Sequence, residues 1–283
     1  DAVAKKPWYI GEEIRPSAPL RRMDFPKLRT DPDTYGGTYW TAIVGCTPSP
    51  GNDYCGVHNN SGVLNKFYYL LTEGGSGTND KGNAYAVTGL GWTKSPIILY
   101  QTELVLTNTA TFADCRTASI LITETLYGTC SPEVKSVTDA WYAVGVGAAY
   151  VPCAFIGFEV ISKDVTELSA TTTCPASTVY NIGLKPMGSL ISGGNPTVSL
   201  NVAGGTALSG RDYSISTSSL TFPAGSTATQ FATLTVFDNG AVMDNKTIAL
   251  AFSLNPMGSN AKVHYDYDTM AIQLFNNDSI PTL

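Results

Sequence analysis

The sequence is poor in charged residues and has very little histidine. Asp, Glu, Lys and Arg make up 14% of the 283 residues, the formal net charge is −6, and the two histidines are His58 and His264. This acidic balance offers no basic surface to a phosphate backbone, so a nucleic-acid partner is excluded. The motif H-E-x-x-H is absent, and two distant histidines cannot form a zinc site of the usual three-ligand type.

Long apolar runs and C-x-x-C pairs are also missing. No apolar stretch approaches the ~20 residues that a membrane-spanning helix needs, so we expect no membrane span. The even number of cysteines favours disulfides over zinc or redox chemistry, and disulfides indicate an extracellular protein, secreted or on the cell surface. The chain starts at Asp1 with neither a methionine nor a signal peptide, so we expect the mature or excised portion of a longer protein.

The chain is long enough for two domains, and its pattern changes near residue 150. Residues 1–149 begin with an irregular, proline-rich segment and continue with helical spacing of apolar residues. Caps and periodicity predict four helices: one from Asn60 or Ser61 to Gly74-Gly75, one over 93–106, one over 112–127, and one from Pro132. Residues 150–283 show short alternating runs separated by Gly, Pro and Asn turns, which predict an all-β sandwich.

The most informative stretch runs from Asp53 through His58 into the first predicted helix. An imidazole at the start of a helix is held rigidly, because the apolar face of that helix fixes its direction. A lone histidine is more often a structural residue, so the neighbouring residues decide its interpretation. The segment 53–71 resembles the motif of thermolysin-like zinc metallopeptidases that carries the catalytic histidine.

The resemblance to thermolysin-like peptidases continues through residues 1–147, which correspond to the mostly α-helical C-terminal lobe of that family. Matching segments occur in the family's order, among them Trp8–Ile14, Asp31–Tyr35, Tyr85–Gly91 and Val137–Gly145. The H-E-x-x-H helix and the downstream zinc-ligand glutamate segment are not present. The resemblance therefore implies that zinc is bound by ligands outside this chain, in a missing N-terminal lobe, and that the chain alone is inactive.

The resemblance also implies roles for particular side chains. In such a site zinc activates a water molecule, and His58 donates to the oxyanion of the intermediate. Asp53 accepts the other ring N–H and fixes its tautomer, and Arg21 holds the substrate carbonyl on the leaving side. The substrate is a peptide or protein cut before a hydrophobic residue, whose side chain meets an apolar wall formed by Ile10, Gly11, Ile14 and Leu20.

Residues 150–283 resemble a Calx-β domain in the segments Gly210–Tyr213, Thr233–Asp238 and Leu274–Asp278. The implied fold is an all-β Greek-key sandwich of the Calx-β or immunoglobulin-like kind. Some members of that family bind calcium through acidic loops. The candidate calcium ligands of this chain are Glu167, Asp212, Asp238 and Asp278. In the helical lobe Glu12 matches a calcium ligand, but Pro7 and Tyr9 stand where the family has carboxylates, so we expect the double calcium site to be lost.

The cysteines predict a covalent framework. Cys55 stands where the family usually has a glycine, and we expect Cys46–Cys55 to staple the loop that presents His58. Cys153–Cys174 would tie the junction to the edge of the sandwich. Cys115 lies roughly 18 Å along its helix from the turn that holds Cys130, at ~1.5 Å per residue, which excludes a bond between them. Either both stay free, or one of them exchanges partners with the Cys153–Cys174 pair, with Cys115–Cys153 as the favoured exchange.

Two functions remain open from the sequence. The first is the C-terminal part of a secreted zinc metalloendopeptidase with an accessory sandwich. The alternative is a non-catalytic extracellular binding or adhesion module, in which calcium could take part. The sequence upstream of Asp1 in the parent gene discriminates between them, because only the first function requires an H-E-x-x-H helix there.

Overall fold

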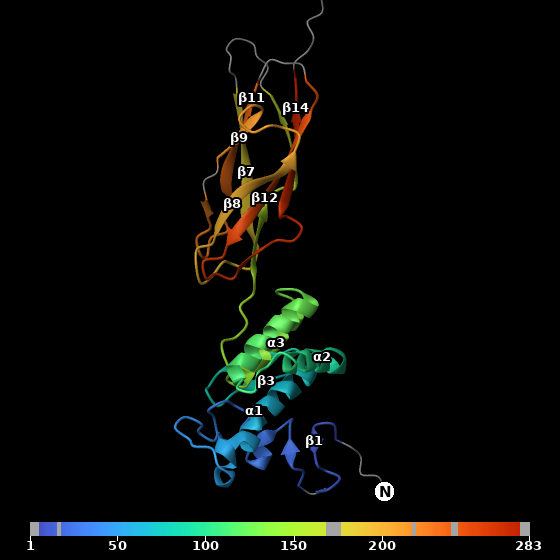
Figure 1. Cartoon of the computed structure of the whole chain (residues 1–283), viewed down its shortest axis with the longest axis vertical. Helices are drawn as coiled ribbons and strands as arrows, with labels where there is room; N and C mark the ends of the chain where they lie inside the picture. The colour runs from blue at the N-terminus through green and yellow to red at the C-terminus, as the bar shows by residue number, and fades with distance from the viewer. Residues whose placement is uncertain (1–5, 16–17, 168–176, 217–218, 239–242, 278–283) are drawn as a thin grey trace, which may run out of the picture. The chain divides into compact units, whose positions relative to one another are not determined.

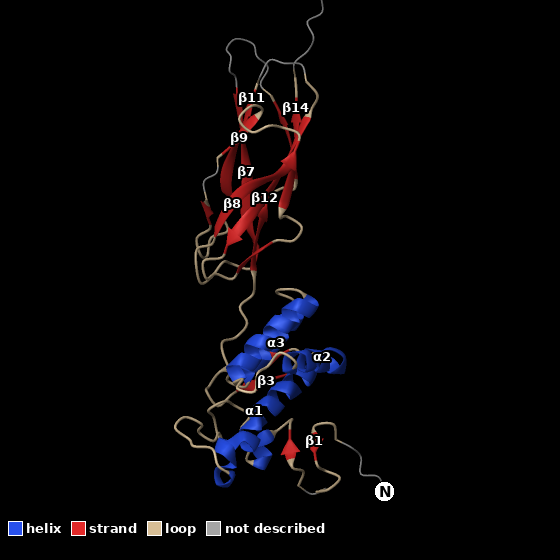
Figure 2. Ribbon diagram, in the orientation of Figure 1, coloured by secondary structure: helices blue, strands red, loops and turns tan. Residues whose placement is uncertain are grey.

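A computed structural model describes residues 6–15, 18–167, 177–216, 219–238 and 243–277 (Figure 1). The chain divides into two compact units, residues 1–150 and residues 151–283. Figure 2 shows that helices dominate the first unit and that the second is built from strands. This is the expected fold class, a helical lobe followed by an all-β sandwich.

The first unit contains four α-helices and two short hairpins. The helices are α1 (Asp53–Glu73), α2 (Gly91–Glu103), α3 (Phe112–Tyr127) and α4 (Pro132–Ala143); β1 (Tyr9–Ile10) pairs with β2 (Arg21–Arg22), and β3 (Gly75–Thr78) with β4 (Ala84–Val87). Two 3-10 turns, Pro26–Arg29 and Pro50–Asn52, precede α1. Helix α3 has the expected bounds, and Thr111 begins it by accepting a hydrogen bond from the backbone N–H of Asp114.

The core of the helical unit is centred on Trp141. Its ring is fully buried and stacks on Phe67 of α1 with centroids 4.0 Å apart. The indole N–H donates to Ser119 Oγ of α3 at 2.8 Å, so one side chain links three helices. The inward residues of α1, among them Val63, Phe67, Leu70 and Leu71, follow the spacing of one helix face. This packing fixes the direction of α1 and therefore the position of its first turn.

Among the cysteines of the helical hairpin and the junction, Cys115 stays free as one alternative predicted, and Cys130 does not. Cys115 is a free, buried thiol on the inner face of α3, whereas Cys130 and Cys153 are both disulfide-bonded. A free Cys130 and an exchange of Cys115 into a bond with Cys153 were therefore wrong expectations. The reason is geometric: Cys115 faces the core of the helical unit, while Cys130 lies in the turn between α3 and α4. Cys174 lies outside the described residues.

The second unit is a two-layer sandwich. One sheet has the strand order β10-β8-β12-β14-β6 and the other β13-β5-β7-β11-β9. Neighbouring strands are antiparallel except for β13 with β5 and β14 with β6, which are parallel. The strands are β5 (Ala154–Phe158), β6 (Ser162–Thr166), β7 (Ser177–Gly188), β8 (Thr197–Gly205), β9 (Tyr213–Ile215), β10 (Leu220–Thr221), β11 (Gln230–Phe237), β12 (Lys246–Asn255), β13 (Ala261–Val263) and β14 (Thr269–Phe275).

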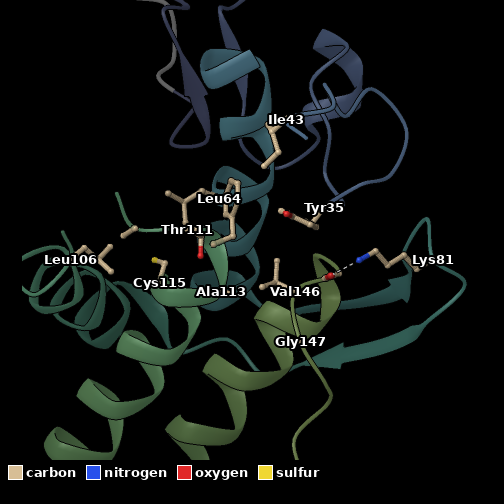
Figure 3. A pocket seen from close by; sticks show the side chains of 13 residues that line it. Tyr35, Ile43, Leu64, Lys81, Leu106, Thr111, Ala113, Cys115, Val146 and Gly147 are labelled. Carbon is tan, nitrogen blue, oxygen red and sulfur yellow. Dashed lines mark hydrogen bonds between the residues drawn. The ribbon is translucent and has the colours of Figure 1, made fainter. Parts of the chain in front are cut away.

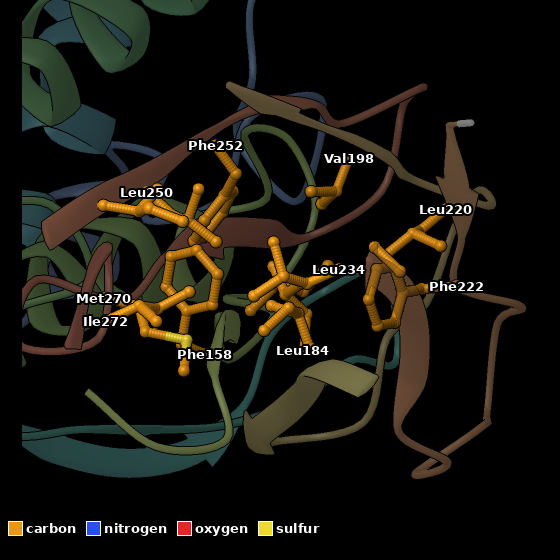
Figure 4. Close-up of a cluster of buried hydrophobic side chains, with 14 of the residues drawn as sticks. Phe158, Leu184, Val198, Leu220, Phe222, Leu234, Leu250, Phe252, Met270 and Ile272 are labelled. Atoms are coloured by element: carbon orange, nitrogen blue, oxygen red, sulfur yellow. The ribbon is translucent and has the colours of Figure 1, made fainter. Parts of the chain in front are cut away.

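Alternating side chains from both sheets fill the space between the layers (Figure 4). In β11 the residues Ala232, Leu234 and Val236 are buried while their neighbours are not, as the period of a half-buried strand requires. Phe158 meets Phe252 edge to face across the sandwich, with centroids 5.4 Å apart. The sandwich therefore has a core of its own, separate from that of the helical unit.

Candidate functional site

The site is built on an unusual turn at the start of α1. Asp53, Tyr54, Cys55 and Gly56 all have positive φ, between 47° and 78°, and regular helix follows. Non-glycine residues rarely adopt this left-handed conformation, so surrounding contacts must hold the turn. A Cβ on Gly56 would lie 2.5 Å from the Cβ of Thr41, so a side chain there would force the two segments apart.

A disulfide and two amide side chains hold the left-handed turn against the preceding loop. The expected Cys46–Cys55 bond is present, with the two Cα atoms 6.0 Å apart. Asn60 is buried; its side chain accepts from the N–H of Thr41 at 3.0 Å and donates to the C=O of Thr41 at 2.9 Å. Asn59 donates to the C=O of Tyr39 at 2.7 Å. Sequence reasoning treated Asn60 only as a helix cap and missed this anchoring role.

The structure brings Asp53 and His58 together. Asp53 Oδ1 is hydrogen-bonded to His58 Nδ1, and Oδ2 accepts from the backbone N–H groups of His58 and Asn59 at 3.0 and 3.2 Å. The hydrogen bond from His58 and the two backbone bonds lower the pKa of Asp53, so it is ionised at neutral pH. The His58 side chain is 72% exposed. Nδ1 is occupied by Asp53, so Nε2 is the ring nitrogen that can make a further contact.

Arg21 lies beside the same turn. Its Nη2 donates to the C=O of His58 at 3.2 Å and its Nη1 to the C=O of Leu20 at 2.9 Å. Asp31 lies 3.6 Å from its Nε, and burial raises the pKa of Asp31 although Arg21 acts in the opposite direction. The guanidinium is thereby oriented with one N–H on each Nη still unused. Asp31 is a partner of Arg21 that the sequence did not suggest.

Three of the four residues of the expected apolar wall lie together. Ile10 pairs with Arg21 across the β1–β2 hairpin, and a Cβ on Gly11 would lie 3.0 Å from Leu20 Cδ1. Ile10 and Leu20 are exposed apolar side chains. Ile14 is 83% exposed. The hairpin that carries Ile10 also carries Arg21, so the expected apolar wall and Arg21 share one element.

The expected metal ligands do not form a metal site among the described residues. No group of three or more His, Cys, Asp and Glu side chains in that part of the chain is arranged to hold an ion. Glu12 is half-buried near the β1–β2 hairpin. Glu167, Asp212 and Asp238 are buried in the sandwich, and Asp278 lies outside the described residues. None of the described helices is both long enough and apolar enough to cross a bilayer.

A cavity of about 750 Å³ opens beside α1 and is mostly apolar (Figure 3). Its walls include Tyr35, Ile43, Leu64 of α1, Phe112 and Cys115 of α3. Burial raises the pKa of Cys115 to about 11, so this thiol stays protonated and is not a nucleophile at neutral pH. Sequence reasoning missed the cavity because its walls come from separate segments, none of which carries a motif.

Comparison with known proteins identifies the helical unit. Residues 1–146 match the family model described as thermolysin metallopeptidase, alpha-helical domain. Bacillolysin of Bacillus caldolyticus and thermolysin of Alicyclobacillus acidocaldarius subsp. acidocaldarius are each 38% identical over 144 residues, covering 49% of this chain and 24% of the relative. The chain belongs to the thermolysin metallopeptidase family. It spans about a quarter of the length of these relatives.

The sandwich resembles Calx-β domains. The apo form of the Calx CBD1 domain superposes with a TM-score of 0.36 at 16% identity, covering 44% of this chain and 99% of that chain. CBD12 from CALX1.2 gives 0.35 at 17% identity, covering 44% and 45%. The expected fold class is confirmed by the family match of the helical unit and by the two sheets of the second unit.

Proposed function

We propose that this chain is the C-terminal part of a secreted zinc metalloendopeptidase. In this proposal it contributes the groups that stabilise the charged intermediate, while the zinc ligands and the general base belong to another part of the parent protein. The observation that carries the proposal is the Asp53–His58 pair on a stapled turn, with Arg21 hydrogen-bonded to the backbone of His58. The disulfide supports secretion, because such bonds persist in oxidising compartments.

The residues of this chain have separate tasks in peptide hydrolysis. Zinc, held by ligands elsewhere in the parent, would supply the Lewis acid that polarises a water molecule and the scissile carbonyl. His58 Nε2 donates to the oxyanion as it develops, and Asp53 holds the ring through Nδ1 so that this nitrogen faces the substrate. The free N–H groups of Arg21 bind the substrate carbonyl on the leaving side. Because these donors are fixed before reaction, they stabilise the intermediate more than the substrate.

Ile10, Gly11 and Leu20 set the substrate preference in this proposal. Their apolar surface accepts the hydrophobic side chain of the residue that follows the cut bond, for example a leucine. Replacing Leu20 by alanine in the intact parent should lower the preference for leucine over alanine at that position about tenfold, because apolar contact area is lost. The measurement is kcat/KM for two peptides that differ only there.

The matched control for the substrate wall is Leu126→Ala. Leu126 is an exposed leucine on α3 and lies outside the site. This variant should keep the preference of the unmodified protein. An unchanged preference in the Leu20 variant, or cleavage that favours a charged residue after the cut bond, would contradict the assignment of the wall.

A further inference from the structure

Acidic side chains are buried at one end of the sandwich. Asp212 directly precedes β9, and Asp238 directly follows β11, the strand with which β9 pairs. Their exposed fractions are 0% and 4%. Carboxylates buried to this extent need positive charge nearby, since an unpaired buried charge is strongly destabilising. In the Calx-β resemblance that charge would come from calcium.

Both oxygens of the Asp212 carboxylate already accept hydrogen bonds from donors of the protein. Oδ1 accepts from Lys246 Nζ at 2.7 Å and from Arg211 Nε at 3.0 Å. Oδ2 accepts from the backbone N–H of Leu208 at 2.7 Å and from Arg211 Nη2 at 3.2 Å. Burial would raise the pKa of Asp212, but these donors outweigh it and hold the pKa at about 2. Each oxygen has two lone pairs, so four donors use them all.

Lys246 reaches Asp212 from the opposite layer of the sandwich. It is the first residue of β12, in the sheet that contains β14, whereas Asp212 leads into β9 of the other sheet. The Lys246 side chain is only 12% exposed, so its ammonium lies inside this end of the domain. The ion pair therefore joins the two sheets. In a calcium-binding sandwich, a divalent ion shared between the sheets would do the same.

We infer that the ammonium of Lys246 is the structural cation of this end of the sandwich, so that the domain holds together without calcium. Calcium needs six to eight oxygen ligands, and Asp212 has no lone pair left to offer. An ammonium at 2.7 Å from Oδ1 also repels a second cation. The inference concerns the sandwich alone and does not depend on the peptidase function.

Calcium titration of the unmodified 283-residue chain tests this inference directly. All four tryptophans lie in residues 1–150, so tryptophan fluorescence follows the helical unit, and a calorimetric transition without a change in that fluorescence reports the melting of the sandwich. The melting temperature of the sandwich should be the same in millimolar calcium chloride and in EDTA. Because a ligand that binds only the folded state raises the melting temperature, a calcium-dependent rise of several degrees would overturn the inference.

Two variants test the role of the lysine. Lys246→Met should lower the melting temperature of the sandwich by roughly 10 °C or more, since it removes the buried ammonium and leaves Arg211, whose side chain is 54% exposed, as the remaining cation on the carboxylate. Lys262→Met, at an exposed lysine of β13, should change it by no more than about 2 °C. Equal melting temperatures of the sandwich in the two variants would refute the structural role of Lys246. If the Lys246 variant does not fold, the calcium titration of the unmodified chain still decides the question.

Discussion

Replacing His58 by alanine in the intact parent protein is expected to lower kcat by about two to three powers of ten, the scale for losing one preorganised oxyanion donor. The bound zinc should stay at the level of the unmodified protein, because His58 is paired with Asp53 and is not a metal ligand in this account. Steady-state kinetics on a hydrophobic peptide and metal analysis of the same preparation make the measurement.

The chain offers a matched control for the His58 variant. His264, the other histidine, lies in the sandwich between Phe155, Tyr265 and Tyr267 and has no part in the proposed chemistry. His264→Ala should leave kcat unchanged. A loss of zinc equal to the loss of activity in the His58 variant would show that His58 binds the metal and that its role has been misassigned.

Removal of the Cys46–Cys55 bond is expected to lower both stability and activity. With Cys46 and Cys55 both replaced by serine, the loop-entropy estimate for so short a loop is a loss of about 2–3 kcal/mol. The larger effect should be on kcat, because the bond holds the left-handed turn that positions His58. The rate depends strongly on the position of a catalytic group, and a displacement of ~1 Å can lower it about a hundredfold. Urea unfolding and steady-state kinetics measure the two effects.

Cys115→Ala is the control that distinguishes loss of the Cys46–Cys55 disulfide from a general effect of replacing a cysteine. Cys115 is a free thiol on α3, away from the turn. Its replacement should leave kcat unchanged. If the serine double variant keeps the kcat of the unmodified protein while losing stability, the bond stabilises the fold but does not position His58.

The helical unit was predictable where local signals decide the structure. Thr111 with Asp114 begins α3, and Gly128 follows its last residue, so both ends of that helix are encoded within a few positions. Regular helix in α1 begins after Gly56, a few residues before the expected cap at Asn60 or Ser61. The first turn depends on a disulfide and on contacts with Thr41, and periodicity carries no information about such partners.

The site was predictable as a set of residues but not as an arrangement. The pair Asp53 and His58 and the nearby Arg21 could be named from sequence resemblance, and the structure brings them together. Asn60 supports the turn through Thr41, 19 positions earlier in the sequence. Asp31 lies beside Arg21, 10 positions away from it in the sequence. In the sandwich, Asp212 was a candidate calcium ligand, but its nearest cation is Lys246, 34 residues later in the sequence. Only tertiary structure shows these partners.

The most direct test of the account is a parallel assay of the pure 283-residue chain and the intact parent for peptide hydrolysis and bound zinc. The chain alone should bind no stoichiometric zinc and cut no peptide, because no metal-binding group is assembled among its described residues. The parent should bind zinc and cleave peptides before hydrophobic residues, and a chelator should abolish that cleavage. Chelator-sensitive hydrolysis by the pure chain, or a parent that neither binds zinc nor cuts peptides, would contradict the account.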